Sequence, residues 1–253
     1  MSYRLGIADL QVHTTVSDGM ASPEDVVLWA SKNTNLDVIA ITDHDRIDGA
    51  FRAINFAHAN NLNIEVIAGI EITTLSGHLL GLFLNQPIPP FRSLDRTVEA
   101  IRNQGGLSII PHPMSLLPPS IRLRTIENMM ASGSQRPKVD GIEVINPAPI
   151  QSLWQPQVRK RNTQSWHLAE TGGSDAHFLK QVGSAVTRFP GRTADDLNLA
   201  LRVKLTIPER RISPTLREIG LTQLIRQQKR AMSTTPKTAM ESLLAWQWRK
   251  RKN

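Results

Sequence analysis

Short β-rich runs alternate with amphipathic segments along most of the chain, and this alternation limits the folds that it can adopt. Residues 37–42 form a continuous β-rich run, as expected for a strand buried on both faces. Residues 48–60 instead place their apolar side chains at helical spacing. Strands that alternate with helices favour a parallel sheet, and a chain of 253 residues with this many units suits a closed or nearly closed α/β barrel.

The periodicity and the end signals give a set of expected elements. A helix begins at Ser22-Pro23-Glu24, which supplies a cap, a proline at the first position and an acidic first turn. The turn Ser76-Gly77 joins two of the expected strands into a hairpin. We predict strands over residues 5–10, 37–42, 64–72, 78–84, 107–110 and 141–145. Further helices are predicted over 48–60, 93–104, 121–130, 158–170 and 193–203.

The net charge of +8 is concentrated at the end of the chain. Residues 213–253 contain nine Lys or Arg and two acidic residues, so this segment carries +7. We therefore divide the chain into a body, 1–212, and a basic, helical C-terminal extension, 213–253, with two helices at 216–232 and 240–248. A basic extension favours nucleic acid, an acidic partner or a membrane surface. The alternative is a solvated helical appendage.

Composition excludes several kinds of chemistry. The chain has no cysteine, which excludes disulfides, thiolate metal sites and cysteine nucleophiles. No apolar run approaches the roughly 20 residues needed to span a bilayer, and the first residues do not resemble a signal peptide. We therefore expect a cytoplasmic protein, and the sequence predicts no oligomeric state.

Ionisable residues gather where the expected strands end. In a barrel these ends converge on one face, where active sites are built. Gln11 and His13 lie two residues apart on an extended backbone, so their side chains should point to the same side. Imidazole and carboxylate groups without sulfur suit zinc, manganese or iron, and Glu71 is placed to bridge two ions. The residues at strand ends are His13, Asp18, Asp43, His44, Asp45, Glu71, His78, His112, Asp175 and His177.

Each of these residues alone has a simpler explanation, because a single histidine at a strand end is usually a hydrogen-bonded loop residue. The joint pattern favours function. Asp-x-x-x-His…Ser-Asp-Gly, Ile-Thr-Asp-His-Asp, Gly-Ile-Glu, His-Pro and Ser-Asp-Ala-His follow one another in this order. Together they resemble the PHP (polymerase and histidinol phosphatase) superfamily over roughly residues 7–190.

The resemblance implies a distorted seven-stranded (β/α) barrel with two or three divalent metal ions, Mn²⁺, Zn²⁺ or Fe²⁺. Carried over by position, it implies three ligand sets: Gln11, His13, Glu71 and Asp175; Glu71, His78 and His112; and Asp18, His44 and His177. One position departs from the family, whose first motif is His-x-His where this chain has Gln11-Val12-His13. An amide oxygen is a weaker donor to zinc than imidazole, so the first ion should bind less tightly or be a harder ion such as manganese.

The leading functional prediction is a phosphoesterase that uses a metal-activated water. Its substrates would be nucleotides or short oligonucleotides, as for 3′,5′-nucleotide bisphosphatases and 5′–3′ exonucleases. Asp43 or Asp45 would orient His44, and three residues would contact the substrate phosphate: Arg122, Arg124 and Asn146. The alternatives are a phosphatase of a small metabolite, of the histidinol-phosphatase type, and a non-catalytic module that binds nucleic acid through its basic tail.

Overall fold

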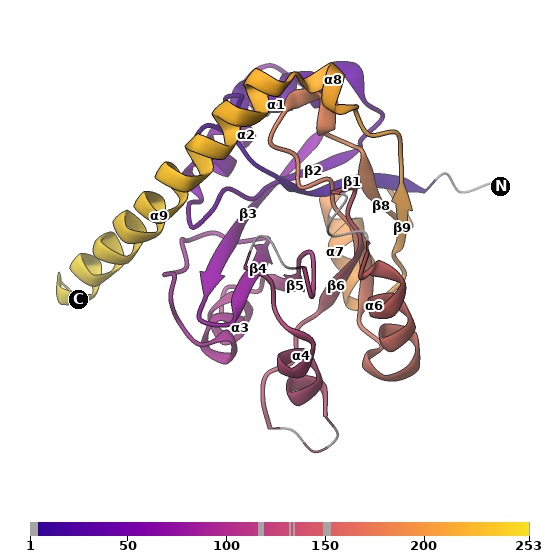
Figure 1. Ribbon diagram of the computed structural model, residues 1–253, viewed down its shortest axis with the longest axis vertical. Helices are drawn as coiled ribbons and strands as arrows, with labels where there is room; N and C mark the ends of the chain where they lie inside the picture. Colours follow the sequence, from indigo (N-terminus) through magenta and orange to yellow (C-terminus); the bar gives the residue numbers. More distant parts are fainter. Residues whose placement is uncertain (1–4, 116–118, 132, 134, 149–152, 253) are drawn as a thin grey trace.

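A curled, mixed sheet with helices packed around it forms the body of the protein (Figure 1). The computed structural model describes residues 5–115, 119–131, 133, 135–148 and 153–252. Within these residues the sheet has nine strands in the order β7-β6-β5-β4-β3-β2-β1-β8-β9. The strands are β1 (Gly6–Val12), β2 (Val38–Ile41), β3 (Glu65–Thr74), β4 (Gly77–Leu82), β5 (Leu107–Ile110), β6 (Gly141–Ile145), β7 (Ala169–Gly172), β8 (Ala185–Phe189) and β9 (Ile207–Arg210). The predicted α/β barrel is confirmed, with nine strands in these residues where the family resemblance implied seven.

The pairing within the sheet is only partly parallel. Strands β1 to β3 pair in parallel, as do β5 to β7. Strand β4 runs antiparallel to both of its neighbours, as expected for the second strand of a hairpin. Strands β8 and β9 were not predicted from the sequence, and they extend the other edge by antiparallel pairing from β1.

The two ends of the sheet approach each other and nearly close the barrel. The backbone N–H of Gly172 donates to Thr187 Oγ1 at 3.0 Å, and that hydroxyl donates back to the Gly172 carbonyl at 2.9 Å. A Cβ atom at position 172 would lie 2.6 Å from the carbonyl oxygen of Val186, so only glycine allows this approach. Beyond β7, Ala176 forms a parallel bridge with Val12. The bridge brings the segment after β7 beside the end of β1.

The helices lie between and around the strands. They are α1 (Pro23–Asn33), α2 (Asp48–Ala59), α3 (Leu94–Arg102), α4 (Leu123–Met130), α6 (Gln155–Arg161), α7 (Ala194–Arg202), α8 (Leu216–Ile219) and α9 (Leu221–Lys252), with a π-helix at Asn162–Trp166 and a 3-10 turn at Leu179–Gln181. Within the described residues, no helix is long and apolar enough to cross a membrane.

Two helix predictions are wrong. The helix predicted over 158–170 ends at Trp166, because His167 adopts a left-handed conformation (φ 52°) and the chain then enters β7. The predicted break at 233–236 does not occur, and α9 continues through Pro236. A helix-interior proline removes one backbone hydrogen bond. The helix still continues because its Thr238 and Ala239 are buried, so packing offsets that loss.

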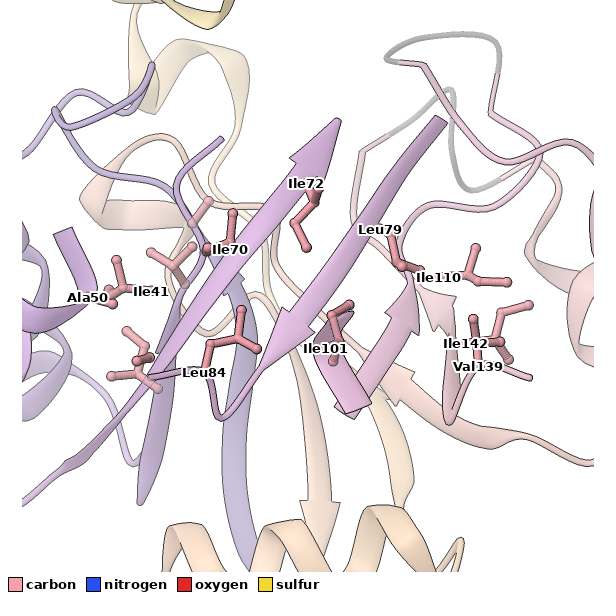
Figure 2. Close-up of a cluster of buried hydrophobic side chains, with 14 of the residues drawn as sticks. Ile41, Ala50, Ile70, Ile72, Leu79, Leu84, Ile101, Ile110, Val139 and Ile142 are labelled. Carbon is pink, nitrogen blue, oxygen red and sulfur yellow. The ribbon is translucent and has the colours of Figure 1, made fainter. Parts of the chain in front are cut away.

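The core has two layers, one on each face of the sheet. One layer fills the space between the sheet and the surrounding helices, with side chains such as Ile41, Ile70 and Ile110 (Figure 2). The other lies on the face that carries Ile67 and includes Leu197 and Leu201 of α7. Glu71 lies four residues beyond Ile67 on β3, so it points to this second face, the interior of the barrel.

Candidate metal centre

A register shift in β1 aims the first candidate ligands into the barrel. Ala8 and Leu10 belong to the interior layer, whereas Val12 belongs to the outer layer. The pairing of β1 with β2 shifts between Asp9 and Val12, as a β-bulge does. Beyond the bulge, Gln11 and His13 both reach Glu71. The sequence expectation that these two side chains project together is therefore confirmed, although simple alternation from Leu10 would have placed them outside.

Glu71 lies at the middle of the cluster. Its Oε1 is 2.7 Å from His78 Nδ1 and 2.9 Å from His112 Nε2. Its Oε2 is 3.1 Å from His13 Nε2 and accepts a hydrogen bond from Gln11 Nε2 at 2.9 Å. The two oxygens of Glu71 therefore face two different groups of side chains, which is the arrangement that a carboxylate bridging two ions needs.

Asp18 is the centre of a second group on the loop after β1. Its Oδ1 lies 3.7 Å from His13 Nδ1 and 3.8 Å from His44 Nε2, and its Oδ2 lies 3.2 Å from His177 Nε2. The rings of His13 and His177 stack with centroids 4.3 Å apart. Asp175 Oδ1 approaches His13 Nε2 at 3.3 Å and so connects this group with Glu71.

The donors fit divalent metal ions. Among the described residues, three sets have ligand atoms within 4.8 Å of one another: His13, Asp18, His44 and His177; His44, Glu71 and His78; and His13, Glu71 and Asp175. Several buried polar atoms here make no hydrogen bond: Gln11 Oε1, and ring nitrogens of His13, His44 and His78 that instead face carboxylate oxygens at 2.7 to 3.8 Å. Unpaired buried polar atoms are costly, and a bound cation would satisfy them. The sets overlap those expected from the sequence, while each ligand role stays a prediction.

Backbone strain also collects at the cluster. His112 has φ 29° and Asp175 has φ 52°, in the left-handed region that non-glycine residues seldom adopt. Such conformations persist only where the surrounding structure enforces them, and they are frequent at functional sites. Both residues are predicted metal ligands, and their side chains lie in the cluster around Glu71.

Burial and opposite charges set the protonation of the cluster. Burial alone would raise the pKa of Glu71, but the nearby charges of His44 and His78 hold that pKa well below its usual range. For Asp18 and Asp175, histidines likewise outweigh burial and lower the pKa.

The pKa values of two histidines in the cluster shift in opposite directions. Burial lowers the pKa of His44 to about 4, so its ring carries charge only at the acid pH where Glu71 also titrates, and near pH 7 it is neutral and able to bind metal. Burial would also lower the pKa of His13, but the carboxylates of Asp175 and Glu71 beside it raise that pKa well above its usual value.

The two carboxylates predicted to orient His44 have other partners. Asp43 Oδ1 accepts hydrogen bonds from Thr14 N at 2.7 Å and Ser17 Oγ at 2.6 Å, and its Oδ2 accepts one from Thr14 Oγ1 at 2.7 Å. Asp45 accepts from the backbone N and the hydroxyl of Thr73, both at 2.7 Å. Asp43 therefore fixes the loop that carries Asp18, and Asp45 fixes the end of β3. Their catalytic role stays a prediction.

The predicted substrate-binding residues are separated in the structure. Arg122 and Arg124 are exposed at the start of α4. Asn146 is buried and donates from Nδ2 to Glu143 Oε2 at 3.0 Å. Glu143, which the sequence analysis did not select, also accepts a hydrogen bond from the backbone N–H of His112 at 2.7 Å. Burial raises the pKa of Glu143 well above its usual value. Its sequence signal is a glutamate in the middle of an apolar strand.

Comparison with known proteins agrees with this geometry. The chain matches the family described as PHP domain over residues 9–110 and the family described as PHP-associated over 159–204. Two uncharacterised proteins of Methanocaldococcus jannaschii are 34% and 32% identical over 150 and 184 residues. These matches cover 55% and 72% of this chain, and 81% and 69% of the relatives. A 5′-3′ exoribonuclease of Haemophilus influenzae is 33% identical over 105 residues, which is 40% of this chain and 37% of the relative.

A solved structure shares the fold. It is a two-domain protein of Bacteroides vulgatus, described as containing a predicted PHP-like metal-dependent phosphoesterase. The TM-score is 0.65 at 20% identity, and the match covers 90% of this chain and 70% of that one. The sequence families, the barrel and the cluster around Glu71 agree, and the chain belongs to the PHP family.

Proposed function

We propose that this protein removes phosphate from nucleotides or from the 5′ end of short oligonucleotides, with two or three divalent ions held around Glu71. The observation that carries the proposal is the cluster of carboxylates and histidines on the two oxygens of Glu71. Bound divalent ions would lower the pKa of a water molecule and stabilise the charge that develops on a phosphoryl group. Mn²⁺, Zn²⁺ and Fe²⁺ all suit donors of this kind.

The side chains of the cluster differ in access. Those of His13 and His112 are 0% exposed, whereas those of Asp175 and His177 are 12% and 18% exposed. The substrate phosphate therefore reaches the centre from the side of Asp175 and His177. A site whose ligands are this little exposed favours a terminal phosphate over a phosphate in the middle of a long strand.

Two features support a nucleotide or oligonucleotide as the substrate. The Haemophilus influenzae relative is named as an enzyme that acts on RNA from its 5′ end. The basic C-terminal segment adds positive charge that would attract a polyanion. Exposed cations near the end of α9 include Arg249, Lys250 and Arg251.

A screen with parallel metal analysis tests the proposal. The purified protein with Mn²⁺ would be assayed for phosphate release from 3′,5′-bisphosphorylated nucleosides, 5′-phosphorylated short RNA and histidinol phosphate. Glu71→Gln should abolish hydrolysis and reduce bound metal, whereas His58→Gln, on the exposed side of α2, should change neither. Release from histidinol phosphate alone would favour the small-metabolite alternative. Oligonucleotide binding without release from any ester would favour the non-catalytic alternative.

A further inference from the structure

The C-terminal helix touches the metal centre. Helix α9 starts beside α8 and runs along one side of the barrel (Figure 1). Gln227 and Arg230 lie three residues apart on α9 and so share one face of the helix. Both contact the loop after β1, which carries Asp18.

Gln227 is buried beside Asp18. Its residue is 6% exposed, and its Nε2 donates a long hydrogen bond to Asp18 Oδ2 at 3.5 Å. Its Oε1 accepts from Gln228 Nε2 at 2.9 Å, which fixes the orientation of the amide. Burying an amide costs free energy unless it is hydrogen-bonded, and a helix packed on a barrel usually buries apolar residues. A buried glutamine aimed at a cluster carboxylate therefore indicates a role at the centre.

Hydrogen bonds from Arg230 and Ser242 also hold α9 on the loops of the cluster. Arg230 donates from Nε to the Ser17 carbonyl at 3.1 Å and from Nη2 to the Thr15 carbonyl at 2.5 Å. Ser242, three turns further along, donates to the Asp45 carbonyl at 2.6 Å. The helix thus spans the loop that carries Asp18 and the loop that carries His44.

We propose that Gln227 is a positioning residue of the metal centre and that α9 is part of its wall. Asp18 directs Oδ1 toward His13 and His44, and directs Oδ2 toward His177 and Gln227. A carboxylate that binds metal is commonly oriented by an outer hydrogen-bond donor. Gln227 supplies that donor, and Arg230 keeps the loop in place. The inference rests on the proposed function only in that it requires the cluster to bind metal.

Manganese binding to the metal-free protein tests the inference without any substrate. We would compare Gln227→Met, which keeps the side-chain volume but removes the amide, with Gln223→Met, an exposed glutamine one turn earlier. Free Mn²⁺ would be followed by electron paramagnetic resonance. Loss of an outer donor typically weakens metal binding by about 10- to 100-fold. We expect this loss in one class of sites for Gln227→Met, with the remaining sites unchanged and the melting temperature matching that of Gln223→Met.

A second variant tests separately whether the contact of α9 with the loop of Asp18 matters for metal binding. Arg230→Met should weaken the same class of sites, because it releases the loop on which Asp18 lies. Matching isotherms for Gln227→Met and Gln223→Met would overturn the inference, as would equal weakening of every site together with a lower melting temperature. Wild-type protein that binds Mn²⁺ but hydrolyses no phosphate ester would refute the proposed function, and the isotherms would still decide the role of Gln227. Wild-type protein that binds no Mn²⁺ would overturn both.

Discussion

Replacing Gln11 by histidine should change which metal the centre prefers. Gln11 is fully buried, its Nε2 donates to Glu71 Oε2 at 2.9 Å, and its Oε1 has no hydrogen-bond partner. The substitution removes the donor that occupies one oxygen of Glu71. It also replaces a neutral oxygen ligand by an imidazole nitrogen. Gly173 packs closely against this position, because a Cβ atom there would lie 3.2 Å from Gln11 Cβ.

The size of the change follows from these contacts. An unsatisfied buried acceptor costs about 1–3 kcal/mol, and an oxygen-seeking ion such as Mn²⁺ recovers that cost when it binds Oε1. Gln11→His removes this gain for Mn²⁺ and adds a nitrogen donor for Zn²⁺. We therefore expect the ratio of Zn²⁺ to Mn²⁺ affinity to rise by at least about tenfold, equivalent to ~1.4 kcal/mol.

Competition titrations with a chromophoric chelator would measure both affinities in the metal-free protein. Gln86→His, which adds a histidine at an exposed glutamine, is the matched control. If Gln11→His leaves the ratio of the two affinities at the wild-type value, position 11 is not a metal ligand. If both metals bind more tightly by the same factor, the effect comes from freeing Glu71 and not from the new ring.

Three further predictions follow from the site and the tail. In metal-free protein, the raised pKa of His13 gives stability that is lost as pH rises above its unfolded value of 6.5, whereas the lowered pKa of His44 causes a loss as pH falls from 6.5 to about 4 and the lowered pKa of Asp18 causes a further loss below its unfolded value of 3.8; these groups together place the maximum of stability near pH 6.5. Melting temperatures with and without metal would check this, because bound metal should remove the loss above pH 7. Asp43→Ala leaves the donors of Thr14 and Ser17 unpaired and should cost on the order of 3 kcal/mol in urea unfolding. Replacing the three basic residues 249–251 by glutamine should lower the slope of log affinity against log salt for single-stranded RNA by up to about 2, whereas an unchanged slope would leave these three residues without a role in RNA binding.

The sequence predicted those parts of the molecule that depend on local pattern and on the order of strands. A strand end followed by a histidine or a carboxylate predicted the position of nearly every residue of the cluster, because barrel topology brings strand ends together. The bulge in β1 has no such signal, since the shift between Asp9 and Val12 depends on pairing with β2. The sequence analysis missed Glu143 because its link to the site is a hydrogen bond from the backbone of His112, which follows a different strand.

The C-terminal helix also shows that local sequence signals can be overridden by contacts distant in sequence. Pro236 and the polar residues before it are a sound local signal for a break, yet α9 is continuous. Its stability comes from contacts distant in sequence, such as Arg230 with Ser17 and Ser242 with Asp45. Local propensity could not reveal these contacts, and they place the extension beside the metal centre.

The charge of the cluster limits how many ions it holds without an anion. The three carboxylates, Asp18, Glu71 and Asp175, have lowered pKa values and together supply −3, while burial raises the pKa of Glu143 and so disfavours a fourth negative charge. Two divalent ions leave a net +1, and a third leaves +3 in a buried site. We therefore expect the third ion to bind weakly alone and at least tenfold more tightly with inorganic phosphate, whose own affinity must rise by the same factor. Manganese isotherms with and without phosphate would measure this coupling, and identical isotherms would show that the cluster completes its metal set without the substrate's charge.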